Sequence, residues 1–386
     1  MRAQFLPFHE PLLGEEEIAS VVDCLRSGWL TSGIKVKEFE RDFSAYVGCQ
    51  HALAVNSCTA ALHLALEAVG VGPGDEVITC PMTFTATAAV IEHLGARPAL
   101  VDCERSTLNL DPSLIEARIT PRTRAILPVH FGGQSCEMDT ILGIARAHGL
   151  PVVEDAAHAL PTRYRGRMIG TLGDVTCFSF YATKTVTTGE GGMAVTDRAD
   201  LAERMRLMHF HGMSRDAWKR YTQNGSWSYE ILAAGYKYNL TDIAASIGIH
   251  QLRRAEAFQV RRRRIARMYS EALSVVRGVE VPKVQDEGGH AWHLYVLRLV
   301  PEALTIDRDT FIARLVAMNI GVSVHFIPLH LHPYYRDKYG FAPTDFPNAC
   351  EAFRRSLSLP IYPKMTDGDV QDVIDAIRSL AEEHQR

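Results

Sequence analysis

Lys184 lies in the segment FSFYATKTVTTGEGG, residues 178–192, where an apolar run ends in a serine and a lysine and several glycines follow. A lysine amine can condense with an aldehyde, and it does so readily where burial or neighbouring charge lowers its pKa. Ser179 could donate its hydroxyl to a phosphate, and the glycines allow a tight turn beside a flat ring. These residue types predict a site for pyridoxal phosphate. An ordinary strand, a turn and a solvated lysine would give the same pattern.

A second candidate segment is LPVVEDAAH, residues 150–158, which has the pattern of a short apolar strand that ends in two carboxylates. Open α/β sheets bind ligands at the carboxyl ends of their strands. Asp155 could keep the pyridine nitrogen of the cofactor protonated, so that the ring accepts electrons when a proton leaves an amino acid. His158 could contact the phenolic oxygen of the cofactor. The alternative is that Asp155 caps a helix and His158 is structural.

The third segment, AVNSCTAALHLAL at residues 54–66, changes from an apolar strand through Ser57 and Thr59 into a strongly helical run. A helix start with hydroxyls and free backbone N–H groups binds phosphate, although a plain serine or threonine cap gives the same sequence. The order along the chain is a phosphate-binding helix start, then the aspartate, then the lysine. That order is similar to the order in aspartate-aminotransferase-like enzymes of fold type I.

The composition is that of a globular protein, with 386 residues, 47% hydrophobic and 22% charged, which is long enough for two domains. The net charge of -4 gives no electrostatic reason to expect nucleic acid binding, and the arginines at 261–264 are expected on a solvated or subunit-facing helix surface. Eight scattered cysteines without metal-like spacing indicate reduced thiols in a cytoplasmic protein and no metal site. No export signal or membrane span is indicated.

Short apolar runs separated by helical segments predict a mostly parallel sheet with helices on both faces. The six runs are HALAVN, DEVITC, RPALVD, RAILPV, LPVVED and VTCFSF. We expect an N-terminal arm and a large domain over residues 1–250, and a smaller α+β domain over 251–386. A long arginine-rich helix is expected to lead to AWHLYVLRLV. Helices are also expected over 14–27, over 308–318 and from about Thr366, and a strand in GVSVHFI.

Six segments resemble the DegT/DnrJ/EryC1/StrS family of nucleotide-sugar aminotransferases, and the likeness runs nearly end to end. They are NSCTAALH, PMTFTATA, EDAAHA, FSFYATKTVTTGEGG, GYKYNLTDIAASIG and HFIPLH. GYKYNLTD and HGMSRDAWKRY are most similar to members that aminate UDP-linked 4-keto sugars, as in the UDP-4-amino-4-deoxy-L-arabinose and pseudaminic-acid pathways. The resemblance implies a pyridoxal-phosphate-dependent transferase of fold type I, and a homodimer with shared active sites.

Carried over by position, the resemblance makes Lys184 the Schiff-base lysine, Asp155 the partner of the pyridinium nitrogen and His158 the contact on the phenolate side. Phe84 would stack on the cofactor ring. The residues expected at the cofactor phosphate are Ser57, Thr59, Ala60 through its backbone, Ser179, and Asn239 from the neighbouring subunit. The residues expected on the substrate side are Leu30, Thr31, Ser32, Gly33 and His325.

The activity that the resemblance implies is transfer of the amino group of L-glutamate to a nucleotide-linked keto-sugar, with Lys184 moving the proton in both halves of the reaction. The product would serve surface polysaccharide or glycoconjugate synthesis. Alternatives are amination at the 3-position and a dTDP- or GDP-linked sugar. A more distant alternative is a regulator that has lost its chemistry, and the complete set of Asp155, Ser179, Lys184 and Asn239 counts against it.

Overall fold

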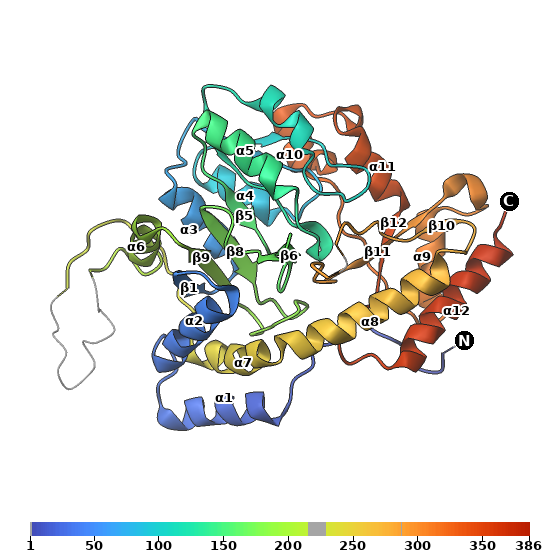
Figure 1. The fold of residues 1–386 in the computed structure, drawn as a ribbon, viewed down its shortest axis with the longest axis horizontal. Coiled ribbons are helices and arrows are strands. Elements are labelled where there is room, and N and C mark those ends of the chain that lie inside the picture. Colours follow the sequence, from blue (N-terminus) through green and yellow to red (C-terminus); the bar gives the residue numbers. More distant parts are fainter. Residues whose placement is uncertain (1, 215–228, 287) are drawn as a thin grey trace.

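The computed structural model describes residues 2–214, 229–286 and 288–386. It contains a large layered region and a smaller C-terminal region, and the long helix α8 (Ala255–Leu273) runs from one to the other (Figure 1). The end of the motif HGMSRDAWKRY, from residue 215 on, lies outside the described residues.

A mostly parallel sheet forms the centre of the large region, as the sequence predicted. The strands of one half are β1 (His51–Val55), β9 (Gly192–Thr196), β8 (Val175–Ser179) and β5 (Val153–Asp155), in that order. The strands of the other half are β3 (Arg97–Leu100), β2 (Glu76–Thr79) and β4 (Thr123–Ile126). Parallel bridges from Ile126 to Val152 and from Val129 to Asp155 join β4 to β5. Only β9 is antiparallel to its neighbours among these strands.

Helices cover both faces of this sheet, because residues along each strand point alternately to opposite sides. On β1, Leu53 and Val55 pack in one core with α3 (Cys58–Ala68) and α6 (Ala199–Met208). Ala52 and Ala54 pack in another core with the helices of the opposite face. Those helices are α2 (Ile34–Val47), α5 (Met138–His148) and α7 (Asp242–Arg253), and α1 (Glu15–Ser27) packs on α7. Two further elements are α4 (Ala86–His93) and the hairpin β6 (Arg163–Tyr164) and β7 (Arg167–Met168).

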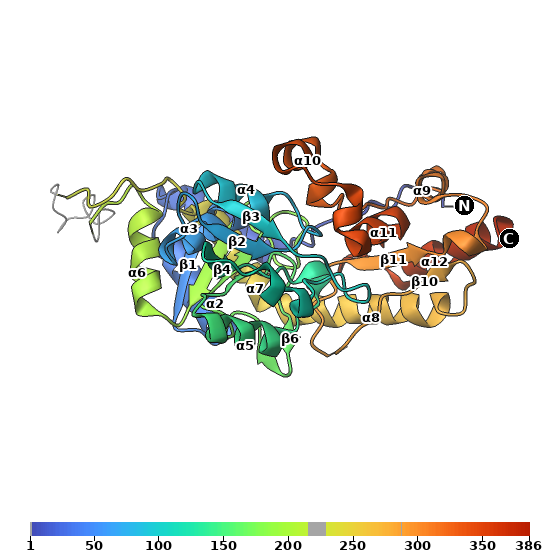
Figure 2. The ribbon, with the colours of Figure 1, turned by 90° about the horizontal axis from the view of Figure 1, so that it is seen from above.

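The C-terminal region has a core of its own around an antiparallel sheet. Its strands are β10 (Val279–Glu280), β11 (Tyr295–Leu299) and β12 (Ser356–Leu359), and its helices include α9 (Arg308–Ala317), α10 (Pro333–Tyr339), α11 (Pro347–Arg355) and α12 (Asp367–Glu383). Figure 2 shows α8 along one side of this region. The cores do not divide at residue 250, because Tyr335 of α10 and Ala349 of α11 pack into the core of the large region. The division into domains over 1–250 and 251–386 stays a prediction.

The predicted strand GVSVHFI is wrong. In residues 321–327 only an isolated bridge from Ser323 to Ser358 forms, and the chain then leaves the small sheet. It does so because Phe326 and Leu329 pack into the core of the large region. His325 lies where the chain crosses between the two regions: its ring contacts Ser358 of β12 in the small sheet, and the charge of Lys184 in the large region acts on its pKa.

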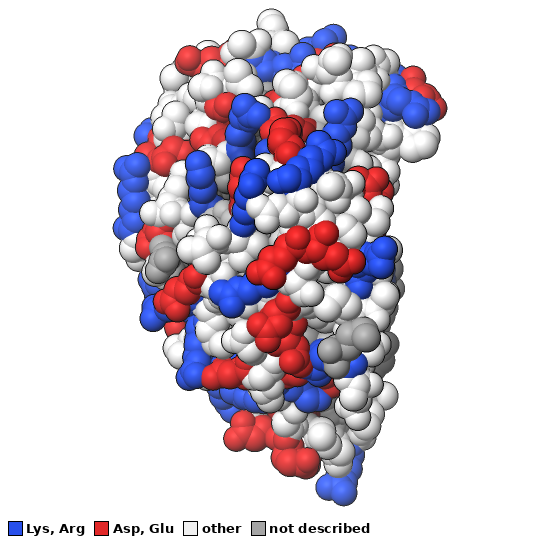
Figure 3. Space-filling view, turned by 90° about the vertical axis from the view of Figure 1, so that its right-hand side faces the viewer, with Lys and Arg blue, Asp and Glu red and all other residues white. Residues whose placement is uncertain are grey.

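The N-terminal arm lies along the C-terminal region, as Figure 1 shows beside α12. Leu6 bridges to Ile320, and Arg2 forms an ion pair of 2.6 Å with Asp369. On the face in Figure 3, acidic and basic side chains are interspersed. Within the described ranges, no helix combines the length and the apolar character that crossing a membrane requires.

Candidate active site

The candidate residues gather at one edge of the large sheet. Asp155 is the last residue of β5, and Ser179 is the last residue of the adjacent parallel strand β8. His158 and Lys184 follow these two strands within a few residues. The charge of Lys184 acts on the pKa of both Asp155 and His158. The structure therefore brings together the lysine, the aspartate and the histidine that the sequence singled out.

Lys184 is partly buried in a turn that its own backbone closes, with its N–H 2.8 Å from the carbonyl oxygen of Tyr181. Burial disfavours the ammonium form and lowers the pKa of Lys184 to about 8. A sizeable fraction of the amine is therefore neutral near neutral pH. The neutral amine is the form that attacks an aldehyde.

The lowered pKa of Lys184 leads to a prediction about loading of the cofactor. The rate at which the cofactor-free protein binds pyridoxal phosphate covalently should rise with pH through a midpoint near 8, because the neutral amine is the nucleophile. Stopped-flow absorbance between pH 6.5 and 9.5 would measure it. A midpoint near the ordinary lysine value of about 10.4 would contradict the buried, destabilised ammonium.

Asp155 is buried and keeps acceptor capacity in spite of two hydrogen bonds. Its Oδ2 accepts from the hydroxyl of Thr87 at 2.8 Å, and its Oδ1 accepts from the N–H of Ala157 at 3.1 Å. Burial raises the pKa of Asp155, and these bonds and the charge of Lys184 oppose that rise. Among the described residues, no cation forms an ion pair with it. A buried carboxylate without a cation fits a ligand that supplies a positively charged N–H group.

The neighbouring carboxylate, Glu154, has a structural role. Strand alternation turns it to the opposite face of β5, where it bonds to His130 at 2.8 Å. It also accepts hydrogen bonds from the N–H of Gly173 and the hydroxyl of Thr176, each at 2.7 Å. Glu154 is thus satisfied within the core, and Asp155 is the carboxylate available to a ligand.

The surroundings of His158 fix which ring nitrogen carries the proton. The N–H of Gly132 donates to Nδ1 at 3.2 Å, so the proton of the neutral ring resides on Nε2. Burial lowers the pKa of His158 well below its usual value, and the charge of Lys184 adds to the effect. His158 is therefore a neutral donor, as a contact with a phenolate oxygen requires. Its ring lies 4.4 Å from that of His293 and 5.8 Å from that of Phe326.

The first turn of α3 has the chemistry of a phosphate site. Ser57 caps the helix and accepts from the N–H of Ala60 at 3.1 Å, so the backbone donor predicted at Ala60 has an internal partner here. Thr59 is exposed at the same helix start. A Cβ on Gly192 would lie 2.5 Å from the carbonyl carbon of Ser57, so only glycine lets β9 pass there. Gly192 pairs with Ser179 on the neighbouring strand β8. Through Gly192, Ser179 is therefore brought near the helix start at Ser57.

Phe84 supplies an exposed aromatic ring beside these groups. It follows β2, its side chain is 59% exposed, and its ring lies 6.0 Å from that of Phe326. An aromatic face is suited to stacking on a flat heterocycle. A helix start for a phosphate, a buried carboxylate for a pyridinium, a neutral histidine donor and a lysine amine together fit pyridoxal phosphate.

Asn239 forms a hydrogen bond with the loop of residues 30–33 of the same chain. Asn239 pairs through its backbone with Val55, just before the phosphate-type helix start, and its Nδ2 donates to the hydroxyl of Ser32 at 2.7 Å. Asp242 fastens the same loop, because the N–H of Gly33 donates to its carboxylate at 2.7 Å. Leu30 and Thr31 belong to this loop. Its contact with substrate stays a prediction.

His325 contacts Ser358 and Phe8, two residues that the sequence analysis did not single out. Its Nδ1 lies 2.9 Å from the hydroxyl of Ser358, and its ring stacks on Phe8 of the N-terminal arm at 5.4 Å. Burial and, after it, the charge of Lys184 lower the pKa of His325 to about 4. Thr87 was also missed, although it stands three residues after Phe84 in the same motif.

The expectation of a surface position for all four arginines at 261–264 is wrong for Arg262. This side chain is fully buried and donates to the carbonyl oxygens of Trp292 at 3.1 Å and Ile361 at 2.7 Å. Burial lowers the pKa of Arg262 to about 9. Arg262 ties α8 to the loop that carries His293, and thereby supports the packing beside His158.

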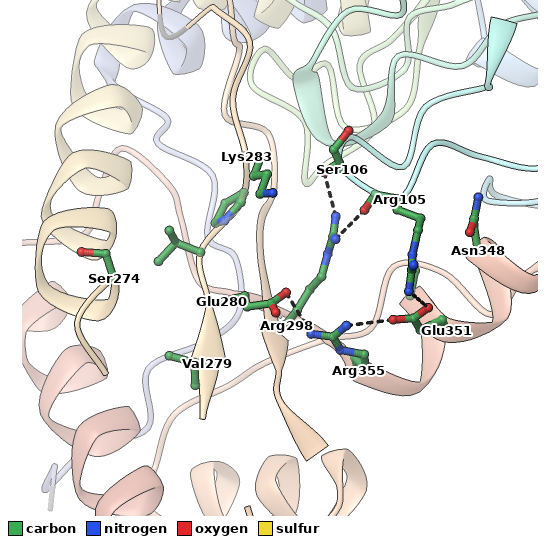
Figure 4. Close-up of a pocket in the computed structure, with 13 residues that line it drawn as sticks. Arg105, Ser106, Ser274, Val279, Glu280, Lys283, Arg298, Asn348, Glu351 and Arg355 are labelled. Atoms are coloured by element: carbon green, nitrogen blue, oxygen red, sulfur yellow. Dashed lines mark hydrogen bonds and ion pairs between the residues drawn. The ribbon is translucent and has the colours of Figure 1, made fainter. Parts of the chain in front are cut away.

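Two cavities of similar size lie among the described residues, and one of them adjoins the candidate site. The first, about 650 Å³, includes Phe84 in its wall. The second, about 660 Å³, lies between the large region and β10, β11 and α11, and Figure 4 shows its charged lining. There Arg355 pairs with Glu280 at 2.8 Å and with Glu351 at 2.9 Å, and Arg298 donates to backbone carbonyls. Arg355 and Arg298 thus have partners within the chain, and the cavity contains none of the candidate residues.

The fold and the site together define a pyridoxal-phosphate-dependent transferase of fold type I. Residues 11–378 match the DegT/DnrJ/EryC1/StrS aminotransferase family, and the chain belongs to that family. The predicted family, fold class and enzymatic character are therefore confirmed.

Named relatives cover almost the whole chain. It is 54% identical over 380 residues to the spore coat polysaccharide biosynthesis protein SpsC of Bacillus subtilis, covering 98% of each chain. It superposes with a TM-score of 0.91 on the PMP form of the putative sugar aminotransferase Spr1654 of Streptococcus pneumoniae, with 36% identity over 98% of this chain and 99% of that one. It also superposes with a TM-score of 0.92 on PseC of Helicobacter pylori, an aminotransferase involved in the biosynthesis of pseudoaminic acid. The sequence identity is 27%, over 98% of this chain and 100% of that one.

Proposed function

We propose that this protein transfers the amino group of L-glutamate to a nucleotide-linked 4-keto-sugar, most readily a UDP-sugar. The observation that carries the proposal is the placement of Lys184, buried Asp155 and His158 together at the carboxyl ends of the parallel strands β5 and β8. The names of SpsC and PseC support a sugar acceptor and use of the product in a polysaccharide or a related glycoconjugate. We place the reaction in the cytoplasm, where its eight cysteines stay reduced.

Each residue of the site has a separate task in this proposal. Pyridoxal phosphate, when bound to Lys184, supplies an electron sink for the carbon that loses its proton. With the cofactor bound, Asp155 would hold the pyridine nitrogen in its protonated form, and His158 would donate its Nε2 proton on the phenolic side. Nζ of Lys184 removes the proton from the α-carbon of glutamate, and in the second half it delivers a proton to the sugar carbon. The helix start at Ser57 and Thr59 holds the phosphate.

The experiment that tests this activity follows the absorbance of the purified protein with pyridoxal phosphate and then with L-glutamate. We expect the absorbance band of the loaded cofactor to shift to that of its amine form, and 2-oxoglutarate to appear in equal amount. Keto-sugars linked to UDP, dTDP or GDP are then added, and the aminated product is identified by mass spectrometry and its ring position by NMR. Failure to bind the cofactor would remove the enzymatic proposal and favour a regulator.

The acceptor experiment also separates the alternatives that belong to the same chemistry. If the product is aminated at C3, or if a dTDP- or GDP-sugar is preferred, the assignment of a UDP-linked 4-keto-sugar as the acceptor is wrong. The proposed roles of Lys184 and Asp155 would be unchanged.

We propose further that the protein is a homodimer in which Asn239 serves the phosphate site of the partner subunit. A mixed dimer of Lys184→Ala and Asn239→Ala subunits then regains one intact site, made of Lys184 from one subunit and Asn239 from the other. Its activity should exceed that of either homodimer. Lack of such complementation in purified mixed dimers would restrict Asn239 to its own chain, beside Val55 and Ser32.

A further inference from the structure

The cavity of about 650 Å³ adjoins the candidate site at Phe84. Phe84 belongs to its wall, and so do Val324 and Phe326, the residues on either side of His325. Its far wall is formed by residues 332–335 at the start of α10. The far end of a long substrate whose reacting carbon reaches Lys184 would have this space available to it.

The residues that line this cavity suit an uncharged, flat part of a ligand. Four aromatic rings take part, those of Phe84, Phe326, Tyr334 and Tyr335. The described lining contains no lysine or arginine, and the carboxylate of Glu92 is neutralised by Lys338 at 2.7 Å. A diphosphate requires cations, so this cavity does not suit the phosphates of a nucleotide-sugar. Aromatic walls suit a nucleobase, because every base presents a face for stacking.

The far wall is held in place before any ligand binds. The hydroxyl of Tyr335 lies 2.9 Å from that of Thr85, just before α4. Glu92 of α4 accepts hydrogen bonds from the hydroxyls of Tyr339, at 2.7 Å, and of Tyr334. The ring of Tyr334 stays 58% exposed, so a ligand can reach it. A fixed, accessible ring loses little conformational freedom when a ligand stacks on it.

We propose that this cavity binds the nucleoside of the nucleotide-sugar, with Tyr334 as a stacking residue and α10 as the wall that determines the accepted base. The inference rests on the proposed function, and it assigns part of the substrate to a place in the structure. It also explains how one catalytic centre could be combined with different nucleotides, because α10 is separate from the strand ends that carry Lys184 and Asp155.

The test compares Tyr334→Ala with Tyr334→Phe in the cofactor-loaded protein. Binding of UDP, dTDP and GDP is measured by calorimetry, and the tightest of them is used. We expect the alanine variant to bind it about tenfold or more weakly, and the phenylalanine variant to stay within about threefold of the natural protein, because stacking on an aromatic ring supplies most of the contact. The reaction with L-glutamate alone should be unchanged in both variants.

The possible failures are distinguishable. If the natural protein binds a nucleoside diphosphate and aminates a nucleotide-sugar, but Tyr334→Ala leaves both affinity and KM unchanged, the nucleoside lies elsewhere and the proposed function stands. An equal loss in the phenylalanine variant would assign the effect to the Tyr334–Glu92 hydrogen bond and would overturn stacking. If the natural protein neither binds these nucleotides nor converts their sugars, the proposed function itself fails.

Discussion

Replacing Lys184 with alanine is expected to abolish transamination while the fold survives. The variant loses the amine that bonds to the cofactor and the group that moves the proton in both halves of the reaction. Proton transfer by one positioned side chain is worth about 10²–10⁴-fold in rate, and loss of the covalent anchor adds to that. Lys184 stands in a turn at the sheet edge, outside the buried cores. Steady-state rates with L-glutamate and a nucleotide keto-sugar would measure the loss.

The matched control is Lys184→Arg, which keeps a long cationic side chain. A guanidinium stays protonated in proteins, so this variant should be as inactive as the alanine variant and should lack the covalent cofactor band. Circular dichroism and size-exclusion chromatography should match those of the natural protein for both variants. Transamination retained in either variant would disprove the assignment of the proton shuttle to Lys184.

The sequence could predict the order of the catalytic groups because local patterns carry them. The strands β5 and β8 are apolar runs, and each ends in the polar residue that faces the site. Parallel neighbours then place Asp155 and Ser179 at the same edge. The sequence pattern did not distinguish Asp155 from the neighbouring carboxylate, Glu154. The structure does, because Glu154 points to the opposite face of the strand and contacts His130 and Thr176 in the core.

Features that depend on distant contacts were beyond the sequence. GVSVHFI has the composition of a strand, yet packing of Phe326 against the large core draws the chain out of the small sheet. The strand β9 was missed because it begins with Gly192, a residue that local propensity disfavours in strands and that close contact with Ser57 requires. Arg262 carries the same charge as its neighbours, and only its position on the inner face of α8 buries it.

The far end of the candidate site was missed for a similar reason. Tyr335 lies 250 residues after Thr85, and Tyr334 lies 242 residues after Glu92, yet each contacts that earlier residue. A single sequence gives no sign of that proximity. The carboxylate of Glu92, which holds Tyr334, lies near the end of α4, where the local sequence has no feature that marks it. The proposed nucleoside site is therefore built from tertiary contacts, whereas the candidate catalytic residues lie on local motifs.

The second large effect is expected at Asp155. Its replacement by alanine removes the carboxylate that would keep the pyridine nitrogen protonated, and it leaves the hydroxyl of Thr87 without that acceptor. Loss of one preorganised electrostatic contact in an active site costs about 10²–10³-fold in kcat. Asp155→Asn is the matched control, because its amide retains the shape and an acceptor for Thr87 but carries no charge. Both variants should therefore lose kcat by similar factors.

The stability of the cofactor-free protein separates this role from a structural one. Burial raises the pKa of Asp155, so the folded protein binds its proton more tightly than the unfolded chain does, and ionisation of Asp155 destabilises the fold as the pH rises through this range. Asp155→Asn removes that cost. At neutral pH the cofactor-free asparagine variant should melt no lower than the natural protein, while its cofactor should bind more weakly. A large drop in Tm without the cofactor, with kcat retained in the loaded protein, would instead make Asp155 a structural residue.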